Sequence, residues 1–298
     1  MELFKDTCFD FLGWKRPFIA ASLLLTVAGL VSLIVKGGPR YGIDFQGGAV
    51  MDVRWSETPP VARIRASLAA RMPGVSVVEA HDLAGSHELL ISTPLGTQAG
   101  MPVPQIENIL AQAGGGYSIR SLEMIGPQIG ADLRRQAAFA TAGASAGMLA
   151  YLAWRFRWIY GAAAVIAVVH DTFITIGVFS LANKEISLTV VAALLTLIGY
   201  SMNDTIVVFD RIRENRRRMP RETLRAVVNL SINQTLSRTV LTSGLTLLTA
   251  LSLLWLGGPA LNGFSFALVF GILVGTYSSI FVASPIVVAW EQWRGGRQ

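Results

Sequence analysis

The chain has 298 residues, of which 52% are hydrophobic and only 15% charged. An ordinary soluble protein is about 25% charged, so this composition and the mean hydropathy of +0.50 favour a membrane protein. The net charge is +6, but the basic residues are clustered in a way that indicates membrane topology and not nucleic-acid binding. The single cysteine, Cys8, excludes an intramolecular disulfide and a cysteine-built metal cluster, and the three histidines are too scattered for a metal site.

The first apolar run covers residues 17–35, and about 20 such residues are enough to cross a bilayer. Lys15 and Arg16 precede it. A cleaved signal peptide is the alternative interpretation, but the acidic residues before the run and the length of the run favour an uncleaved anchor. We therefore predict a cytoplasmic N-terminus at 1–16 and a first transmembrane helix at 17–36.

Residues 37–132 differ in character, because charges return in balance and no run is long enough to span a membrane. Met51, Val53 and Trp55 alternate with charged residues, which predicts a half-buried strand. The elements predicted after it are a helix, two strands, a helix and a strand, at about 59–68, 75–80, 88–92, 103–113 and 117–124. The order β-α-β-β-α-β is typical of a ferredoxin-like α+β domain.

Five further apolar runs lie within 133–290, at about 134–153, 159–181, 186–209, 236–256 and 262–290. A basic loop at about 210–235 separates the fourth and fifth spans. Arginines also follow the second span and lie in the C-terminal segment 291–298. The positive-inside rule places all three regions in the cytoplasm. The prediction is a polytopic α-helical membrane protein with six transmembrane helices, cytoplasmic termini and an α+β domain outside the cytoplasm.

Ionisable residues within apolar helices cost about 2.5–3.5 kcal/mol each on insertion scales, so they mark function better than surface charges do. Asp204 lies in the fourth span, and Arg238 lies one turn into a fifth span that we expect to begin near Leu236. Because these spans are antiparallel, the two side chains are expected at similar depth and could pair. Two interpretations stay open: a fixed ion pair, or a carboxylate that releases its partner when it is protonated.

Other polar residues accompany this pair. His170 and Asp171 lie near the middle of the third span, and both side chains can carry protons. Asn203 precedes Asp204 and could satisfy a charge or line a wet path. Helix packing is the alternative role for each of them. No phosphate-binding loop, nucleophile set or metal spacing is present, so we expect no catalytic residue, no metal, no cofactor and no enzymatic activity.

Five stretches together resemble the SecD/SecF family of protein-export membrane proteins, in the resistance-nodulation-division superfamily. The third of them resembles the SecF branch in particular. The likeness runs through the whole chain in the expected order, at residues 41–48 (YGIDFQGG), 126–130 (GPQIG), 169–172 (VHDT), 199–215 (GYSMNDTIVVFDRIREN) and 236–239 (LSRT).

The resemblance implies a role and a set of residues. Family members lie in the bacterial inner membrane with a periplasmic domain, so the resemblance implies that location for this chain. They assist protein export and are thought to use the proton motive force. The residues matching Asp204 and Arg238 belong to the proton path, to which we add Asn203, His170 and Asp171. The residues of the other motifs, which we expect to couple helices and outer domain, are Gly42, Asp44, Phe45, Gly47, Gly48, Gly126, Pro127, Gly130, Asp210, Arg211 and Arg213.

The resemblance also implies partners: SecD, which supplies six more helices, the SecYEG channel, YajC, the translocating polypeptide and the lipid bilayer, with no nucleic acid. Two alternatives stay open. The chain could be half of a small-molecule exporter of the same superfamily, although six helices and one small domain argue against that as a lone unit. It could also be a passive scaffold of the translocation channel, which would tolerate neutral replacements at Asp204 and Arg238.

Overall fold

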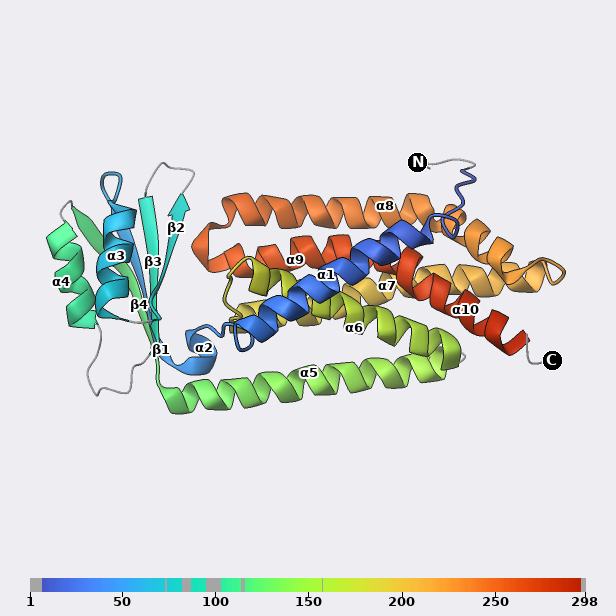
Figure 1. Cartoon of the computed structure of the whole chain (residues 1–298), viewed down its shortest axis with the longest axis horizontal. Coiled ribbons are helices and arrows are strands. Elements are labelled where there is room, and N and C mark those ends of the chain that lie inside the picture. Colours follow the sequence, from blue (N-terminus) through green and yellow to red (C-terminus); the bar gives the residue numbers. More distant parts are fainter. Residues whose placement is uncertain are drawn as a thin grey trace.

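The computed structural model describes residues 7–72, 74–81, 87–94, 103–113, 116–156 and 158–295. A bundle of long helices carries a small sheet domain at one end (Figure 1). Helix α1 begins, and helix α10 ends, at the end of the bundle far from the sheet. The chain therefore crosses the length of the bundle before it reaches the sheet, and it returns there after the last long helix.

The helical part contains α1 (Lys15–Val35), α5 (Pro127–Arg155), α6 (Trp158–Leu181), α7 (Leu188–Arg218), α8 (Leu224–Leu256), α9 (Gly258–Ser278), a π-helical turn (Ser279–Ala283) and α10 (Ser284–Gly295). Within the described ranges, five helical segments are long and apolar enough to cross a membrane: Lys15–Val35, Trp158–Leu181, Leu188–Arg218, Leu224–Leu256 and Ala260–Trp293. The last of them joins α9, the π-helical turn and α10 into one path.

Helix α5 covers the predicted second span, yet it is not among these five apolar segments. It is continuous over 29 residues. Its first half carries Asp132, Arg134, Arg135 and Gln136, and much of the rest is alanine and glycine, so its hydropathy is low. Its side chains are mostly exposed. The helix itself is as predicted, whereas its hydropathy alone does not mark it as a span.

The sheet domain has the predicted element order. It consists of β1 (Gly48–Trp55), α3 (Val61–Arg71), β2 (Ser76–His81), β3 (His87–Pro94), α4 (Val103–Ala113) and β4 (Tyr117–Ile125). The strands form one sheet in the order β2-β3-β1-β4, with every neighbouring pair antiparallel. The two helices cover one face.

The core of this domain lies between that face and the helices. Met51, Val53 and Trp55 of β1 are buried against Ile64 of α3 and Leu110 of α4. Burial of large apolar side chains contributes about 1.5–3 kcal/mol each, so this cluster accounts for the stability of a small sheet. The alternation along β1 and the helical spacing after it, both visible in the sequence, are confirmed.

The basic segment at 210–235, expected as a loop, is mostly helical. Helix α7 continues to Arg218, and α8 already begins at Leu224, where the Thr223 hydroxyl caps it by accepting a bond from the Ala226 amide. Only residues 219–223 separate the two helices. Arginine is a good helix former, so loss of hydrophobicity at residue 210 did not end the helix.

Candidate functional site

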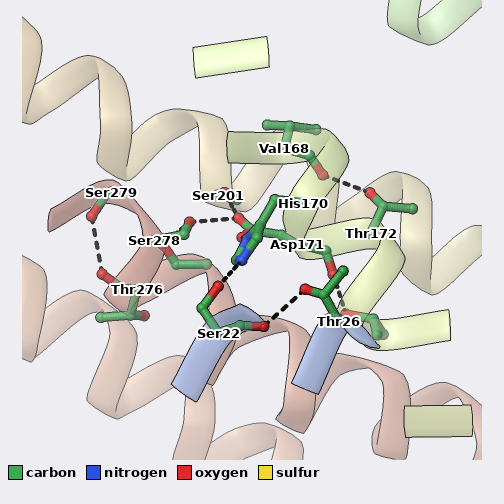
Figure 2. Close-up of polar contacts among 12 residues, drawn as sticks. Ser22, Thr26, Val168, His170, Asp171, Thr172, Ser201, Thr276, Ser278 and Ser279 are labelled. Carbon is green, nitrogen blue, oxygen red and sulfur yellow. Dashed lines mark hydrogen bonds and ion pairs between the residues drawn. The ribbon is translucent and has the colours of Figure 1, made fainter. Parts of the chain in front are cut away.

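A buried polar cluster surrounds Asp171 in the middle of the helical bundle (Figure 2). The Asp171 Oδ1 atom lies 2.8 Å from His170 Nδ1. Its Oδ2 atom accepts bonds from the hydroxyls of Ser201 at 2.6 Å and Ser278 at 2.7 Å. The Ser22 hydroxyl contacts His170 Nε2. The Asp171 carboxylate therefore joins α6, α7 and α9, and His170 adds α1 through Ser22.

Helices α1 and α6 run side by side in a constant register, which brings Ser22 to His170. Gly29 and Gly177 meet at the crossing, where a Cβ atom on Gly29 would lie 2.7 Å from the Gly177 Cα atom. One turn further on, the hydroxyls of Ser32 and Ser180 are 2.8 Å apart. All three pairs are separated by 148 residues, so the two helices are parallel and close enough for short polar side chains to touch.

Asp204 lies in a second buried position, between α7 and α8. Its side chain is only 4% exposed, and its Oδ2 atom accepts a bond of 3.1 Å from the Ser243 hydroxyl. A carboxylate in an apolar bundle is costly unless it is bonded or paired, and here one hydroxyl is the partner that the structure gives it.

The predicted pairing of Asp204 with Arg238 is wrong: both residues are described, and no ion pair joins them. Arg238 is exposed and acts on Asp204 through space only. Helix α8 begins at Leu224 and not near Leu236, and the residue of α8 that contacts Asp204 is Ser243. Arg238 precedes Ser243 by five residues, or about 7.5 Å along the helix axis.

Asn203 points differently from its neighbour, since it is exposed whereas Asp204 is buried. Asn203 and Arg238 thus lie on the outer surface of the bundle, and Asp171 and Asp204 lie inside it. The predicted proton-path residues are therefore divided between two buried carboxylate sites and an exposed polar surface on α7 and α8.

The first motif, residues 41–48, joins the end of α1 to the start of α7. Asp44, in the short helix α2 (Ile43–Gln46), accepts a bond of 2.7 Å from the Leu188 amide, the first residue of α7. The Gly42 amide donates to the Ile186 carbonyl at 2.9 Å, and the Ile186 amide donates to the Arg40 carbonyl at 2.7 Å. Asp44 thus satisfies one of the free amides at the start of the helix that carries Asp204.

The second motif packs directly on the first. Gly47 has a φ of 77° and lies so close to Pro127 that a Cβ atom would be 2.9 Å from the Pro127 Cα atom. A Cβ atom on Gly130 would lie 3.0 Å from the Gly47 amide nitrogen. Gly126 and Pro127 begin α5, and Phe45 is buried beneath the junction. Glycine is needed here for close backbone approach, and Gly48 leads straight into β1.

The charged residues at the far end of α7 are tied to other helices. Asp210 forms a two-oxygen ion pair with Arg155 of α5, at 2.9 and 3.1 Å. Arg211 bonds Gln234 of α8 and Glu214 of its own helix, each at 2.7 Å. Arg213 is exposed. This end of α7 is therefore held to its neighbours in the bundle.

Sequence reasoning missed the hydroxyls that complete both carboxylate sites. Nothing in the sequence distinguishes Ser22, Ser201, Ser243 and Ser278 from the other polar residues of the apolar runs. Serines inside apolar runs were the available signal, but such residues usually pack helices. No group of three metal-ligating side chains occurs in the described part of the chain.

Comparisons with known proteins agree with this architecture. Residues 105–293 match the family model described as protein export membrane protein SecD/SecF, C-terminal, and residues 31–54 match the SecD/SecF GG motif. The chain is 41% identical to the protein translocase subunit SecF of Koribacter versatilis, covering 100% of this chain and 95% of that one. It is 42% identical to SecF of Desulfurispirillum indicum, covering 94% and 91%.

Solved structures give the same relationship. The crystal structure of SecDF from Thermus thermophilus, described as a translocon-associated membrane protein, superposes with a TM-score of 0.83 at 40% identity. A second SecDF structure, in a super-membrane-facing form, has a TM-score of 0.73. The two matches cover 96% and 99% of this chain but only 39% and 40% of the SecDF chains.

A bundle of apolar helices with buried carboxylates and one small sheet domain is the architecture of a polytopic membrane protein, and the matched family model assigns it to the protein-export class. The chain belongs to the SecF family of protein translocase subunits. Its apolar helices and this family membership make it a multi-pass protein of the bacterial inner membrane.

Proposed function

We propose that this chain is the SecF subunit of the Sec protein translocase, which assists the export of polypeptides through the SecYEG channel together with SecD. The proton motive force is the energy source in this proposal, and the role is not enzymatic. The observation that carries it is Asp204, a buried carboxylate with a single hydroxyl partner, located in the most distinctive family stretch.

The proposed topology has six spans, with α5 as the second. Its length of 29 residues is sufficient, and its exposed surface is available to lipid or to a partner. The arginines of 211–225 lie at the end of the bundle opposite the sheet, so the positive-inside rule places that end in the cytoplasm. The sheet domain, residues 37–132, is then periplasmic, and its element order and strand order support a ferredoxin-like fold.

In the proposed proton path, Asp204 is the group that titrates. Arg238 cannot lose its proton, and it supplies a fixed positive charge near the carboxylate. Asn203 shares the exposed surface with Arg238, and His170 with Asp171 forms a second protonatable site. A proton crossing the membrane releases about 2.3 kcal/mol per 100 mV, enough to bias a two-state element whose charges change.

The proposed coupling route runs through the two packed motifs. A change at Asp204 moves α7, and α7 is tied at its start to Asp44. The motif that contains Asp44 leads into β1, and its glycine Gly47 touches the beginning of α5. Movement of α7 would therefore reach the sheet domain through direct contacts.

Partners complete the proposal. The chain spans about two fifths of the SecDF structures, which supports a SecD partner for the remainder of that assembly. Polar residues on a lipid-facing surface are costly, so the exposed Asn203 and Arg238 favour this face of α7 and α8 for contact with SecD. SecYEG, YajC and the translocating polypeptide enter through the family relationship.

The test is export into membrane vesicles under an imposed proton gradient, with Asp204→Asn compared with wild type at equal membrane levels. Asp132→Asn, an exposed carboxylate at the start of α5, is the control. We expect the gradient to stimulate wild type and the control but not Asp204→Asn. Equal stimulation of all three would make Asp204 structural.

A passive scaffold is the second candidate function, and the Asp171 cluster favours it. That carboxylate has three partners from three helices and resembles a fixed packing element. Equal gradient responses in the experiment above would support this alternative.

A further inference from the structure

A cavity of ≈ 310 Å³ lies where α1 ends, between the membrane helices and the sheet domain. Its walls come from the segment after α1, the loop before α7, Gly74 ahead of β2, and the end of β3. Side chains and backbone of Lys36, Gly38, Arg40, Ser92, Pro94 and Glu185 contribute to the lining. The cavity is distinct from both buried carboxylate sites. Tyr41, Ile43, Gln46 and Gly47 of the first motif also line it, and the proposed function gives that motif a coupling role but no ligand.

The cavity lies at the level of lipid headgroups. Helix α1 has 21 residues and is therefore about 31 Å long, which matches the hydrocarbon thickness of about 30 Å. Lys36 follows α1 directly and so lies at the boundary between the hydrocarbon core and the lipid headgroups. The last residues of the helix, Ile34 and Val35, are 70% and 79% exposed, so an apolar surface for acyl chains leads up to the cavity.

The charges in the cavity suit a zwitterion. Lys36 contacts the Ser180 carbonyl and lies 3.0 Å from Asn183 Oδ1, which fixes its ammonium group at the end of α6. Arg40 lies 3.9 Å from Glu185, a loose pair whose side chains are 43% and 27% exposed. Lys36, Arg40 and Glu185 all line the cavity, so two cationic residues and one carboxylate border the same space. Lys36 would turn from Asn183 toward a bound phosphate, and Glu185 also has a hydrogen bond from Ser76.

We propose that this cavity binds the headgroup of an aminophospholipid, phosphatidylethanolamine, from the leaflet on the side of the sheet domain. Lys36 and Arg40 bind the phosphate, since both are donors suited to phosphate oxygens. The Glu185 carboxylate accepts from the primary ammonium. A choline headgroup has no N–H to donate, and a glycerol headgroup has no cation, so Glu185 selects ethanolamine.

The experiment is native mass spectrometry of the full chain in detergent, with lipids of identical acyl chains added one at a time. Wild type should retain phosphatidylethanolamine in preference to phosphatidylglycerol and phosphatidylcholine. Glu185→Gln should remove that preference, with about fivefold weaker binding of ethanolamine lipid, and Lys36→Gln with Arg40→Gln should weaken binding of all three. Lys184→Gln is the matched control, because Lys184 bonds Asn262 instead.

A second measurement needs no variant and so does not depend on the folding of the mutants. Soluble glycerophosphoethanolamine should compete the lipid off wild type at lower concentration than glycerophosphocholine or inorganic phosphate, because only the first engages Glu185 as well as the two cations. Equal retention of all lipids by wild type, or an unchanged preference in Glu185→Gln, would overturn the proposal. Loss of lipid retention in the complex with SecD would also overturn it, because the partner would then cover the cavity.

Discussion

Asp204 and Asp171 are both carboxylates buried among the membrane helices, but they differ in their bonding. Asp171 has an imidazole and two hydroxyls as partners, and Asp204 has one hydroxyl. Each hydrogen-bond donor stabilises the ionised form of a buried carboxylate. A carboxylate with one donor is therefore held less firmly in its ionised form than a carboxylate with three partners. This contrast supports Asp204 as the titrating group and Asp171 as the anchor of a packed network.

Asp44 illustrates how a motif residue can act on a distant site. Removing its carboxylate in Asp44→Ala should free the Leu188 amide and fray the start of α7, at a cost of about 1 kcal/mol. Asp44→Asn keeps an oxygen acceptor and should retain most of the bond. Hydrogen exchange over residues 186–192 would measure this, with exchange about fivefold faster in the alanine variant. Unchanged exchange in Asp44→Ala would mean that the cap does not hold the helix.

At the scale of elements, the parallel pair α1 and α6 depends on the contact between Gly29 and Gly177. A side chain at Gly177 must collide with the α1 backbone, because a Cβ atom there would lie 2.8 Å from the Gly29 Cα atom. We expect Gly177→Leu to separate the helices and to break the contact of Ser22 with His170. Gly143→Leu in α5 is the matched control, since nothing lies within 4 Å of a Cβ atom there.

Disulfide formation between cysteines placed at Ser32 and Ser180 would report on this pair. Their hydroxyl oxygens are 2.8 Å apart, which is compatible with disulfide geometry, and Cys8→Ser would remove the native thiol. The cross-link should form in the double-cysteine protein that carries Cys8→Ser, and also after the control substitution Gly143→Leu. It should be lost when Gly177→Leu is added. Full cross-linking in Gly177→Leu would contradict the prediction, because it would show that the leucine does not separate α1 from α6.

At the scale of the whole molecule, Glu185 lies at the junction between bundle and sheet. Burial raises the pKa of Glu185 above its ordinary value, and this effect outweighs the attraction of Arg40 and a hydrogen bond from Ser76 of β2. The folded protein then binds more protons than the unfolded chain between the ordinary value of about 4.5 and the raised pKa. Glu185 therefore favours folding at low pH, and this contribution is lost as the pH rises through the raised value.

The resulting prediction is a melting temperature that falls over that pH window in wild type and falls less in Glu185→Gln. Thermal unfolding in detergent from pH 4 to pH 8 would measure it. Glu123→Gln, on the exposed strand β4, serves as the control and should follow wild type. Identical pH profiles for wild type and Glu185→Gln would contradict a raised pKa of Glu185 in the folded protein.

The sequence by itself determined the local structure. Alternation along residues 51–55 predicted β1, long apolar runs predicted the helices, and the element order of the sheet domain followed from the same periodicities. These features depend on neighbours along the chain, and burial on one face of a strand or helix leaves a regular pattern. The motif residues Asp44, Gly47 and Gly130 were also identified, although not what each of them touches.

Only the tertiary structure decided which side chains meet. The packing of α7 against α8 places Ser243, and not Arg238, opposite Asp204. An arginine-rich helix end cannot be distinguished from a loop by hydropathy. The Asp171 cluster depends on the register of four helices. Close glycine contacts occur between α1 and α6, at Gly29 and Gly177, and between α9 and α7, where Gly275 packs on Ser201 of the cluster. A shift of one turn moves a side chain by about 5.4 Å, more than the length of a hydrogen bond, so contacts of this kind follow from packing alone.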